Sequence, residues 1–264
     1  MTRNEQLIAA WLDWLASGNL SPNTIRNRRY TIGTFAKDRD LLAVTTDDVL
    51  DHLRGLTGSA WQRAGHLSAI KSFYAYATGM GFVGHNPAAL VRSVKTHERS
   101  RPALSNGTLD RAILLADDRN RLALLLGSRA GLRREEIATF SSDCIDGDDL
   151  VIVGKGSKER RIPMHPRLRP YCDDLLRSPG WAFPSHVKPG DHVTPETIQR
   201  IVTRALGEPY STHDLRRYAA TQWYDATHDL RAVQQLLGHA DPVTTSRYVR
   251  PNEDSMRAAV LAVA

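Results

Sequence analysis

The sequence predicts a mainly α-helical protein with a small β-hairpin or sheet in its second half, an α+β fold in two domains. Amphipathic helical patterns fill residues 1–90. The stretch DDLVIVGKGSKERRIPMH, residues 148–165, is different: a β-branched run, a glycine-rich turn and a second short run indicate a hairpin. Between the halves, VRSVKTHERSRPALS holds little apolar content and several basic residues, which is typical of an exposed linker.

The first domain is predicted to be a small bundle of four helices. In residues 21–38 Ser21 serves as the N-cap and Pro22 begins the helix. Residues 45–56 open with a threonine cap and two aspartates, which the helix dipole favours there. A longer helix in 59–81 stops at its glycines. The expected core positions are Ile25, Ile32, Phe35 and Ala36, then Leu67, Ile70, Phe73 or Tyr74, and Ala77.

The second domain is predicted to be helical on both sides of the hairpin. Residues 120–140 indicate a buried helix, a turn broken by glycine and a second helix that begins with Glu135 and Glu136. Helical patterns resume at residue 194 and continue to the last residues, 256–264. The expected domains are therefore 1–90 and 105–264, with a linker at 91–104.

Composition narrows the class of protein. The 264 residues carry a formal net charge of +6, spread along the chain, which favours a polyanionic partner. Two cysteines, Cys144 and Cys172, are too few for a disulfide framework and lack metal-ligand spacing. The sequence contains no apolar run long enough to span a membrane and no signal-peptide pattern, so we expect a cytoplasmic protein. No P-loop is evident, and the local acidic cluster of Asp146, Asp148 and Asp149 is interpreted as a solvated loop, so no cofactor or metal is expected.

Several polar side chains stand where folding alone does not require them. Each has an ordinary structural explanation when taken singly, such as an ion pair of Arg133 with Glu136 or a tyrosine packed in the core. Taken together, two arginines, a lysine, two histidines and a tyrosine supply what transfer of a phosphoryl group needs without a metal: clamps on nonbridging oxygens, proton donors and a nucleophile. The set is Arg133, Lys155, His213, Arg216, His239 and Tyr248.

The motifs AGLRREEI, VGKGSKERRIPM, HDLRRYAAT, LLGH and RY, in this order, resemble the tyrosine recombinases, or phage integrase family. The resemblance implies that Arg133 and Arg216 bind the scissile phosphate, that Glu136 supports Arg133, and that Tyr248 is the nucleophile. It implies His213 as the partner of Arg216, His239 at a position where the family has histidine or tryptophan, and Lys155 as general acid, with Lys158 the weaker candidate. The amino-terminal helices resemble the family's core-binding domain, whose DNA contacts would come from Arg26, Arg28, Arg29 and Lys71.

This resemblance implies a site-specific DNA recombinase or integrase that works through a 3′-phosphotyrosine without metal or ATP. Two alternatives stay open: a relaxing enzyme of the type IB topoisomerase class, and a DNA-binding protein without activity. The implied partners are a double-stranded DNA target, further protomers in a homotetramer on two sites, and possible accessory recombination factors, with the enzyme nucleoid-associated when on DNA. Residues 252–264 would form an exchange helix that docks into a neighbouring protomer. The layout is similar to Xer proteins or compact phage integrases, without an arm-binding domain.

Overall fold

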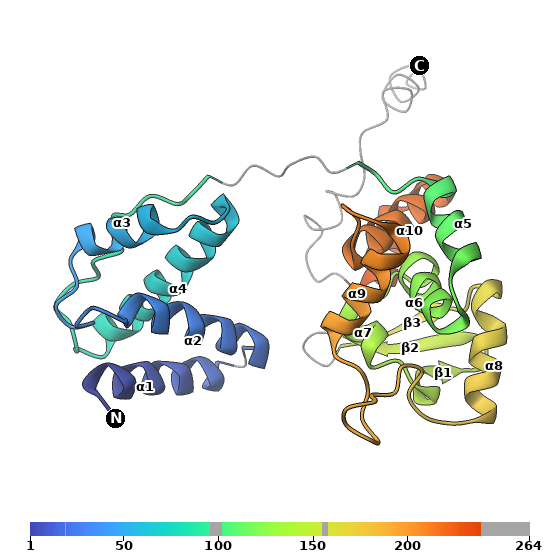
Figure 1. Ribbon diagram of the computed structural model, residues 1–264, viewed down its shortest axis with the longest axis horizontal. Coiled ribbons are helices and arrows are strands. Elements are labelled where there is room, and N and C mark those ends of the chain that lie inside the picture. Colours follow the sequence, from blue (N-terminus) through green and yellow to red (C-terminus); the bar gives the residue numbers. More distant parts are fainter. Residues whose placement is uncertain (19, 96–101, 155–157, 239–264) are drawn as a thin grey trace, which may run out of the picture. The chain divides into compact units, whose positions relative to one another are not determined.

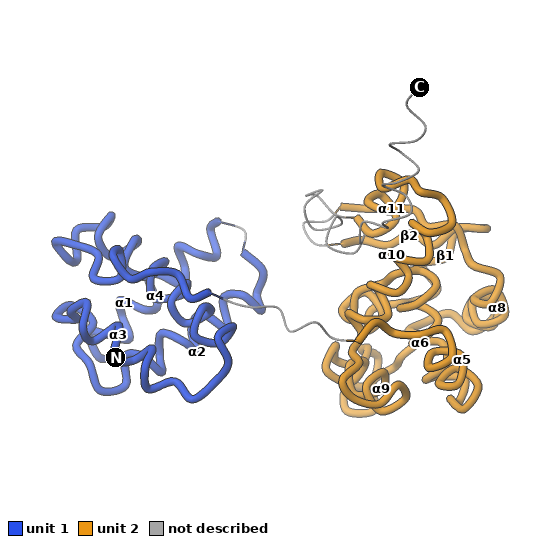
Figure 2. Tube along the Cα trace, turned by 90° about the horizontal axis from the view of Figure 1, so that it is seen from above, with its two compact units in different colours: residues 1–100 blue, residues 101–264 orange. Residues whose placement is uncertain are grey.

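The computed structural model describes residues 1–18, 20–95, 102–154 and 158–238. The chain forms two compact units, residues 1–100 and 101–264, which Figure 2 distinguishes by colour. Mostly helical units with one small antiparallel sheet confirm the predicted fold class. No helix among the described residues is long and apolar enough to cross a membrane.

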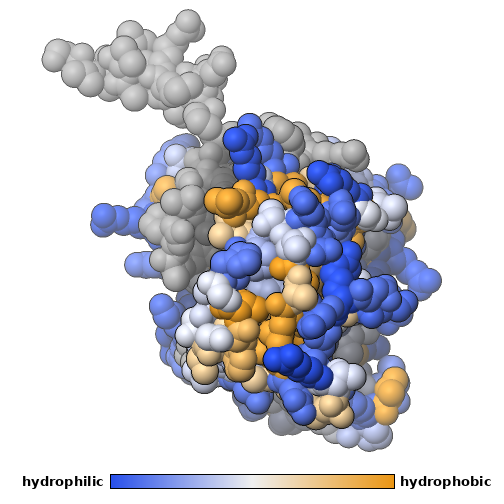
Figure 3. All heavy atoms as spheres, turned by 90° about the vertical axis from the view of Figure 1, so that its left-hand side faces the viewer, coloured by the Kyte–Doolittle hydropathy of each residue, from blue (hydrophilic) through white to orange (hydrophobic). Residues whose placement is uncertain are grey.

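Unit 1 is a helical bundle of α1 (Arg3–Ser17), α2 (Pro22–Ala36), α3 (Thr46–Gly55) and α4 (Ala60–Gly79), drawn in blue to cyan in Figure 1. The predicted caps are confirmed, because Ser21 and Thr45 each accept a hydrogen bond from the first turn of the following helix. Aromatic side chains fill the core, and Trp11 packs edge-on against Phe73. Figure 3 shows a face of the molecule where apolar patches alternate with strongly hydrophilic side chains.

Unit 2 surrounds helix α6 (Asp118–Arg129), whose residues from Leu122 to Ser128 are all buried. Around it lie α5 (Asn106–Leu115), α7 (Arg134–Ala138), α9 (Pro195–Leu206) and α10 (Thr212–Thr227). Strands β1 (Ile145–Asp146), β2 (Asp149–Val153) and β3 (Glu159–Pro163) form an antiparallel sheet in this order (Figure 1). The described part of unit 2 also contains two 3-10 turns (Ser142–Cys144 and Pro166–Leu168), α8 (Arg169–Arg177) and α11 (Leu230–Leu237).

Two glycines set how closely the helices of unit 2 approach one another. A Cβ at Gly127 of α6 would lie 2.8 Å from Leu215 Cδ1 on α10. The Leu215 side chain therefore packs directly against the backbone of α6 at this glycine. Gly131 has a φ of +63°, and a Cβ there would lie 2.8 Å from the ring of Trp223. The turn after α6 is therefore pressed against α10, the helix that begins with Thr212 and His213.

Two sequence interpretations need correction. Residues 91–104 are not exposed throughout, because Val91 packs in the core of unit 1 and Leu104 in that of unit 2. The acidic cluster near residue 146 is not simply a solvated loop. Asp146 and Asp149 belong to strands and pair with Arg161 at 2.7 and 3.2 Å, and Asp148 pairs with Arg169.

Candidate active site

Arg133 lies where the chain turns from α6 into α7. It occupies the N-cap position, where the first backbone N–H groups of a helix have no partner within the helix. Glu136 at the third helical position supplies an acceptor: its Oε2 accepts from the Arg133 backbone N–H at 2.8 Å. Its Oε1 accepts from Arg133 Nη1 at 2.7 Å. One carboxylate thus fixes both the backbone and the guanidinium of Arg133.

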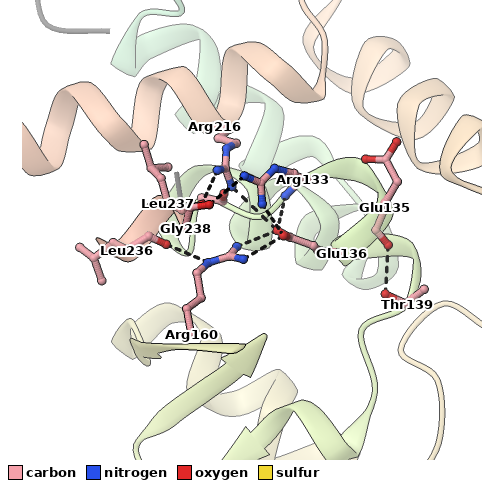
Figure 4. Close-up of polar contacts among 10 residues, drawn as sticks. Arg133, Glu135, Glu136, Thr139, Arg160, Arg216, Leu236, Leu237 and Gly238 are labelled. Atoms are coloured by element: carbon pink, nitrogen blue, oxygen red, sulfur yellow. Dashed lines mark hydrogen bonds and ion pairs between the residues drawn. The ribbon is translucent and has the colours of Figure 1, made fainter. Parts of the chain in front are cut away.

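Arg160 reaches the same carboxylate from the sheet. The register pairs Arg160 with Ile152 and Ile162 with Leu150, so the guanidinium leaves the strand on the buried face. Its Nη1 and Nη2 donate to the two oxygens of Glu136 at 2.8 and 2.7 Å, a bidentate ion pair (Figure 4). Both side chains are buried, with exposed fractions of 8% for Arg160 and 6% for Glu136.

The pKa of Glu136 follows from these contacts. Burial alone would raise the pKa of this carboxyl, because a low-dielectric surrounding disfavours the charged form. The hydrogen bonds and charges of Arg160 and Arg133 outweigh burial and lower the pKa to about 2. Glu136 is therefore a stable anion at neutral pH, and it serves as a structural acceptor rather than as a proton donor.

Helix α10 brings a second arginine to this place. Ser211 caps the helix, and its backbone N–H and hydroxyl donate to Asp214 at 2.9 and 2.7 Å. Arg216, one turn further, is buried, and its Nη1 lies 3.8 Å from Glu136 Oε2. His213 stands three residues earlier on the same helix and is exposed.

The carboxyl end of α11 is held by all three arginines. Arg160 Nε donates to the carbonyl of Leu236 at 3.0 Å, Arg216 Nη2 to Leu237 at 2.5 Å and Arg133 Nη2 to Gly238 at 3.4 Å. These are carbonyls that a helix end leaves without partners, and the helix dipole favours cations beside them. Figure 4 shows the three guanidinium groups converging between Glu136 and this helix end.

The cluster is suited to binding an anion. Three fixed positive charges surround one carboxylate in the described part of unit 2, so positive charge is in excess. Arg133 keeps 30% of its side chain exposed, so this arginine is not closed off from solvent. Among the residues with a described position, no three His, Cys, Asp or Glu side chains are grouped to hold a metal ion.

The structure brings together Arg133, Glu136 and Arg216 of the predicted set, with His213 on the same turn of α10 as Arg216. Lys155, His239, Tyr248 and the predicted exchange helix at 252–264 lie outside the described residues. Lys158, the weaker lysine candidate, is exposed beside the start of β3. Arg160 was missed, although its alternation with Ile162 in ERRIP was a signal that its side chain faces inward.

The predicted DNA-contacting residues of unit 1 lie on two packed helices. Arg26 and Arg29 on α2 are exposed, whereas Arg28 on α2 and Lys71 on α4 are half-buried. Arg28 Nη1 donates to Ser72 Oγ at 2.7 Å, so it reaches across to the residue next to Lys71. Arg28 is thereby held against α4.

Comparison with known proteins gives consistent matches. A model described as the phage integrase family matches residues 108–255. The tyrosine recombinase XerC of Pseudomonas syringae pv. tomato is 32% identical over 257 aligned residues, covering 87% of this chain and 85% of that protein. The tyrosine recombinase XerC of Pelobacter propionicus is 30% identical over 285 residues and covers 96% of this chain and 92% of its own length.

Solved structures share the fold. A lambda integrase fragment, crystallised as a dimer bound to a COC′ core site, has a TM-score of 0.78 and covers 94% of this chain and 96% of its own, at 20% identity. A lambda integrase tetramer bound to a Holliday junction has a TM-score of 0.73 at 21% identity, covering 90% of this chain and 77% of its own.

Proposed function

The chain belongs to the phage integrase family and is a tyrosine site-specific recombinase, and we propose that it cleaves and rejoins double-stranded DNA through Tyr248. The observation that carries this proposal is the convergence of Arg133 and Arg216 on the buried carboxylate of Glu136 beside the end of α11. Two fixed guanidiniums at one place are a means of holding the nonbridging oxygens of a phosphodiester.

The reaction proposed is a transesterification. The phenolic oxygen of Tyr248 attacks the scissile phosphorus, a 3′-phosphotyrosine bond forms, and the bond to the 5′ oxygen breaks. Lys155 gives a proton to that leaving oxygen, and His213 and His239 donate hydrogen bonds or relay protons at the phosphate. Since one phosphoester replaces another, rejoining needs neither ATP nor a metal ion.

Arg133 and Arg216 are proposed to stabilise the pentavalent phosphorane. Negative charge grows on the nonbridging oxygens as the nucleophile approaches, and fixed donors cost no reorganisation at that moment. Glu136 supports them by neutralising part of their mutual repulsion and by fixing Arg133 through two contacts of 2.7 and 2.8 Å.

The proposed partner is a double-stranded DNA site contacted by unit 1 through Arg26, Arg28, Arg29 and Lys71. The net charge of +6 and the exposure of Arg26 and Arg29 support this assignment. A homotetramer on two sites is proposed as the active assembly, with residues 252–264 as the segment exchanged between protomers. The lambda integrase tetramer on a Holliday junction, which shares the fold, supports this assembly.

The test is the substitution Tyr248→Phe. The target is first recovered by sequencing the DNA that the purified protein retains, and is then synthesised as a nicked suicide substrate. Wild type should form a covalent protein–DNA adduct on a denaturing gel, with or without EDTA. The variant should form none and should bind the site with an unchanged dissociation constant, because only the nucleophilic oxygen is lost. An adduct in the variant would refute Tyr248 as nucleophile, and loss of the wild-type adduct in EDTA would refute metal-free cleavage.

A further inference from the structure

We propose that Arg160 is a positioning residue for the recombinase reaction, which fixes the hairpin and the end of α11 against the Arg133–Glu136 pair. The inference rests on the proposed function. Lys155 and His239, the proton-transfer residues of that proposal, follow directly in sequence on Gly154 and Gly238. Arg160 would therefore fix the position of the backbone immediately before both of these residues.

The contacts of Arg160 join three separate elements. Its Nη atoms hold Glu136 at 2.8 and 2.7 Å, and its Nε holds the carbonyl of Leu236 at 3.0 Å. The side chain itself comes from β3, so one guanidinium connects the sheet, the start of α7 and the end of α11 (Figure 4). With 8% of the side chain exposed, its role is to hold protein groups rather than to contact DNA.

Two glycines pack directly on this side chain. A Cβ at Gly154 would lie 3.3 Å from Arg160 Nη1, and a Cβ at Gly238 would lie 2.9 Å from Arg160 Cδ. Gly154 N–H also donates to the carbonyl of Lys158 at 2.8 Å and so closes the base of the hairpin. The hairpin and the helix end are thus both fitted to the shape of Arg160.

A buried ion pair of this kind is weak evidence for stability, since the desolvation penalty offsets much of the attraction. It is better explained by geometry, because the planar fork of arginine fixes direction as well as distance. Arg161, the next residue, is a natural comparison. Its side chain is 52% exposed and pairs with Asp146 and Asp149 at the surface.

The test compares Arg160→Lys with Arg161→Lys in the full chain, on the nicked suicide substrate. Lysine keeps the charge but cannot bind Glu136 and Leu236 together. We expect single-turnover adduct formation to fall about 10- to 100-fold in Arg160→Lys, since misplacement by about 1 Å has costs of this size, while the dissociation constant for one site changes less than about threefold. Arg161→Lys should change neither quantity appreciably. Equal rates in the two variants would overturn the proposal.

Gly154→Ala supplies a second variant that leaves the guanidinium chemically intact. Its methyl group would press on Arg160 Nη1, so it should slow adduct formation several-fold in the wild-type background and have no further effect in the Arg160→Lys background. Independent, multiplying effects would mean that the glycine does not act through Arg160, and would contradict the proposal.

Hydrogen exchange supplies a readout that does not require cleavage. In Arg160→Lys the amides of Gly154 and of Gly238 should exchange faster, while those of α6 keep their wild-type protection. Unchanged exchange at Gly154 and Gly238 would overturn the positioning role, and so would faster exchange throughout unit 2, which would indicate a purely structural one. If wild type itself forms no adduct, the proposed function fails, and these exchange measurements still decide the role of Arg160.

Discussion

The two units bury polar groups in different ways. In the described part of unit 1 the buried polar side chains are His52 and His66, whose Nε2 and Nδ1 atoms lie 3.0 Å apart among aromatic rings. Burial lowers the pKa of both, that of His52 to about 4 with the help of nearby positive charge, so the pair is neutral near pH 7. Unit 2 instead buries full charges, with Glu136 and Arg216 in its interior.

The buried polar groups of unit 1 can be explained by packing alone, whereas those of unit 2 point to a chemical role. A neutral pair of rings satisfies its own hydrogen bond and costs little to bury. An ionised carboxylate with three arginines is costly, and apolar side chains of similar size would often give equal or greater stability. The charged interior of unit 2 is therefore best explained by the phosphate that it is proposed to bind, whereas the exposed basic side chains of unit 1 are proposed to contact DNA.

The largest effect is expected from changing the charged interior. Arg216→Lys retains the positive charge but loses the fork that donates to Gly131 and Leu237 at 2.5 Å. We expect adduct formation on the suicide substrate to fall about 100- to 1,000-fold, as for removal of a transition-state donor. Binding to one site, for which unit 1 is proposed to supply DNA contacts, should stay within about threefold. Activity within about tenfold of wild type would show that Arg216 does not stabilise the transition state. The proposed contrast between the two units would then fail.

As the pH falls, unit 1 should lose stability before unit 2. The pKa values of His52 and His66 are lowered, that of His52 to about 4, so the stability that depends on their neutral forms is complete above about pH 6.5 and is lost as the pH falls below it. The pKa of Glu136 is lowered from 4.5 to about 2, so its contribution is present above 4.5 and is lost below it. That contribution is on the order of 3 kcal/mol.

Amide exchange of the full chain, measured from pH 7 downward, should therefore show α4 losing protection before α6. In Glu136→Gln the loss in α6 should no longer depend on pH between 4.5 and 2. If α6 opened first, the two buried sites would not titrate as described.

The smallest effect is expected at the surface of unit 1. Arg29→Ala removes one exposed charge, so DNA affinity should fall a few-fold and the slope of log affinity against log salt should decrease by about one unit. The rate of adduct formation at saturating protein should not change. Asp13→Asn on α1 is the control: it also changes the surface of unit 1 by one charge, of the opposite sign, at another helix. A changed cleavage rate in Arg29→Ala would mean that unit 1 takes part in the chemistry.

Much of the fold could be predicted because its signals are local. Ser21 and Thr45 act on the backbone within a few residues, and α2 and α3 begin directly after them, as predicted. The grouping of Arg133 with Glu136 was also accessible, because three residues separate them at the start of one helix. The roles of Lys155, His239 and Tyr248 stay predictions.

Arg160 could not be found in this way. Its partners Glu136 and Leu236 are 24 and 76 residues distant, and their meeting depends on the packing of α7 and α11 against the sheet. In the sequence motif that contains Arg160, the lysines are the residues that the family resemblance singles out. The ends of the predicted linker show the same limit, since Val91 and Leu104 belong to the cores of units 1 and 2.

The excess of positive charge around Glu136 has a consequence for the timing of the proposed reaction. A bound phosphodiester carries one negative charge, and an attacking phenolate brings a second. Among the described residues, three guanidiniums and one carboxylate leave a surplus of two positive charges. In the proposed reaction this surplus would attract the doubly charged phosphorane more strongly than the singly charged phosphodiester, and would therefore lower the activation energy rather than merely tighten binding.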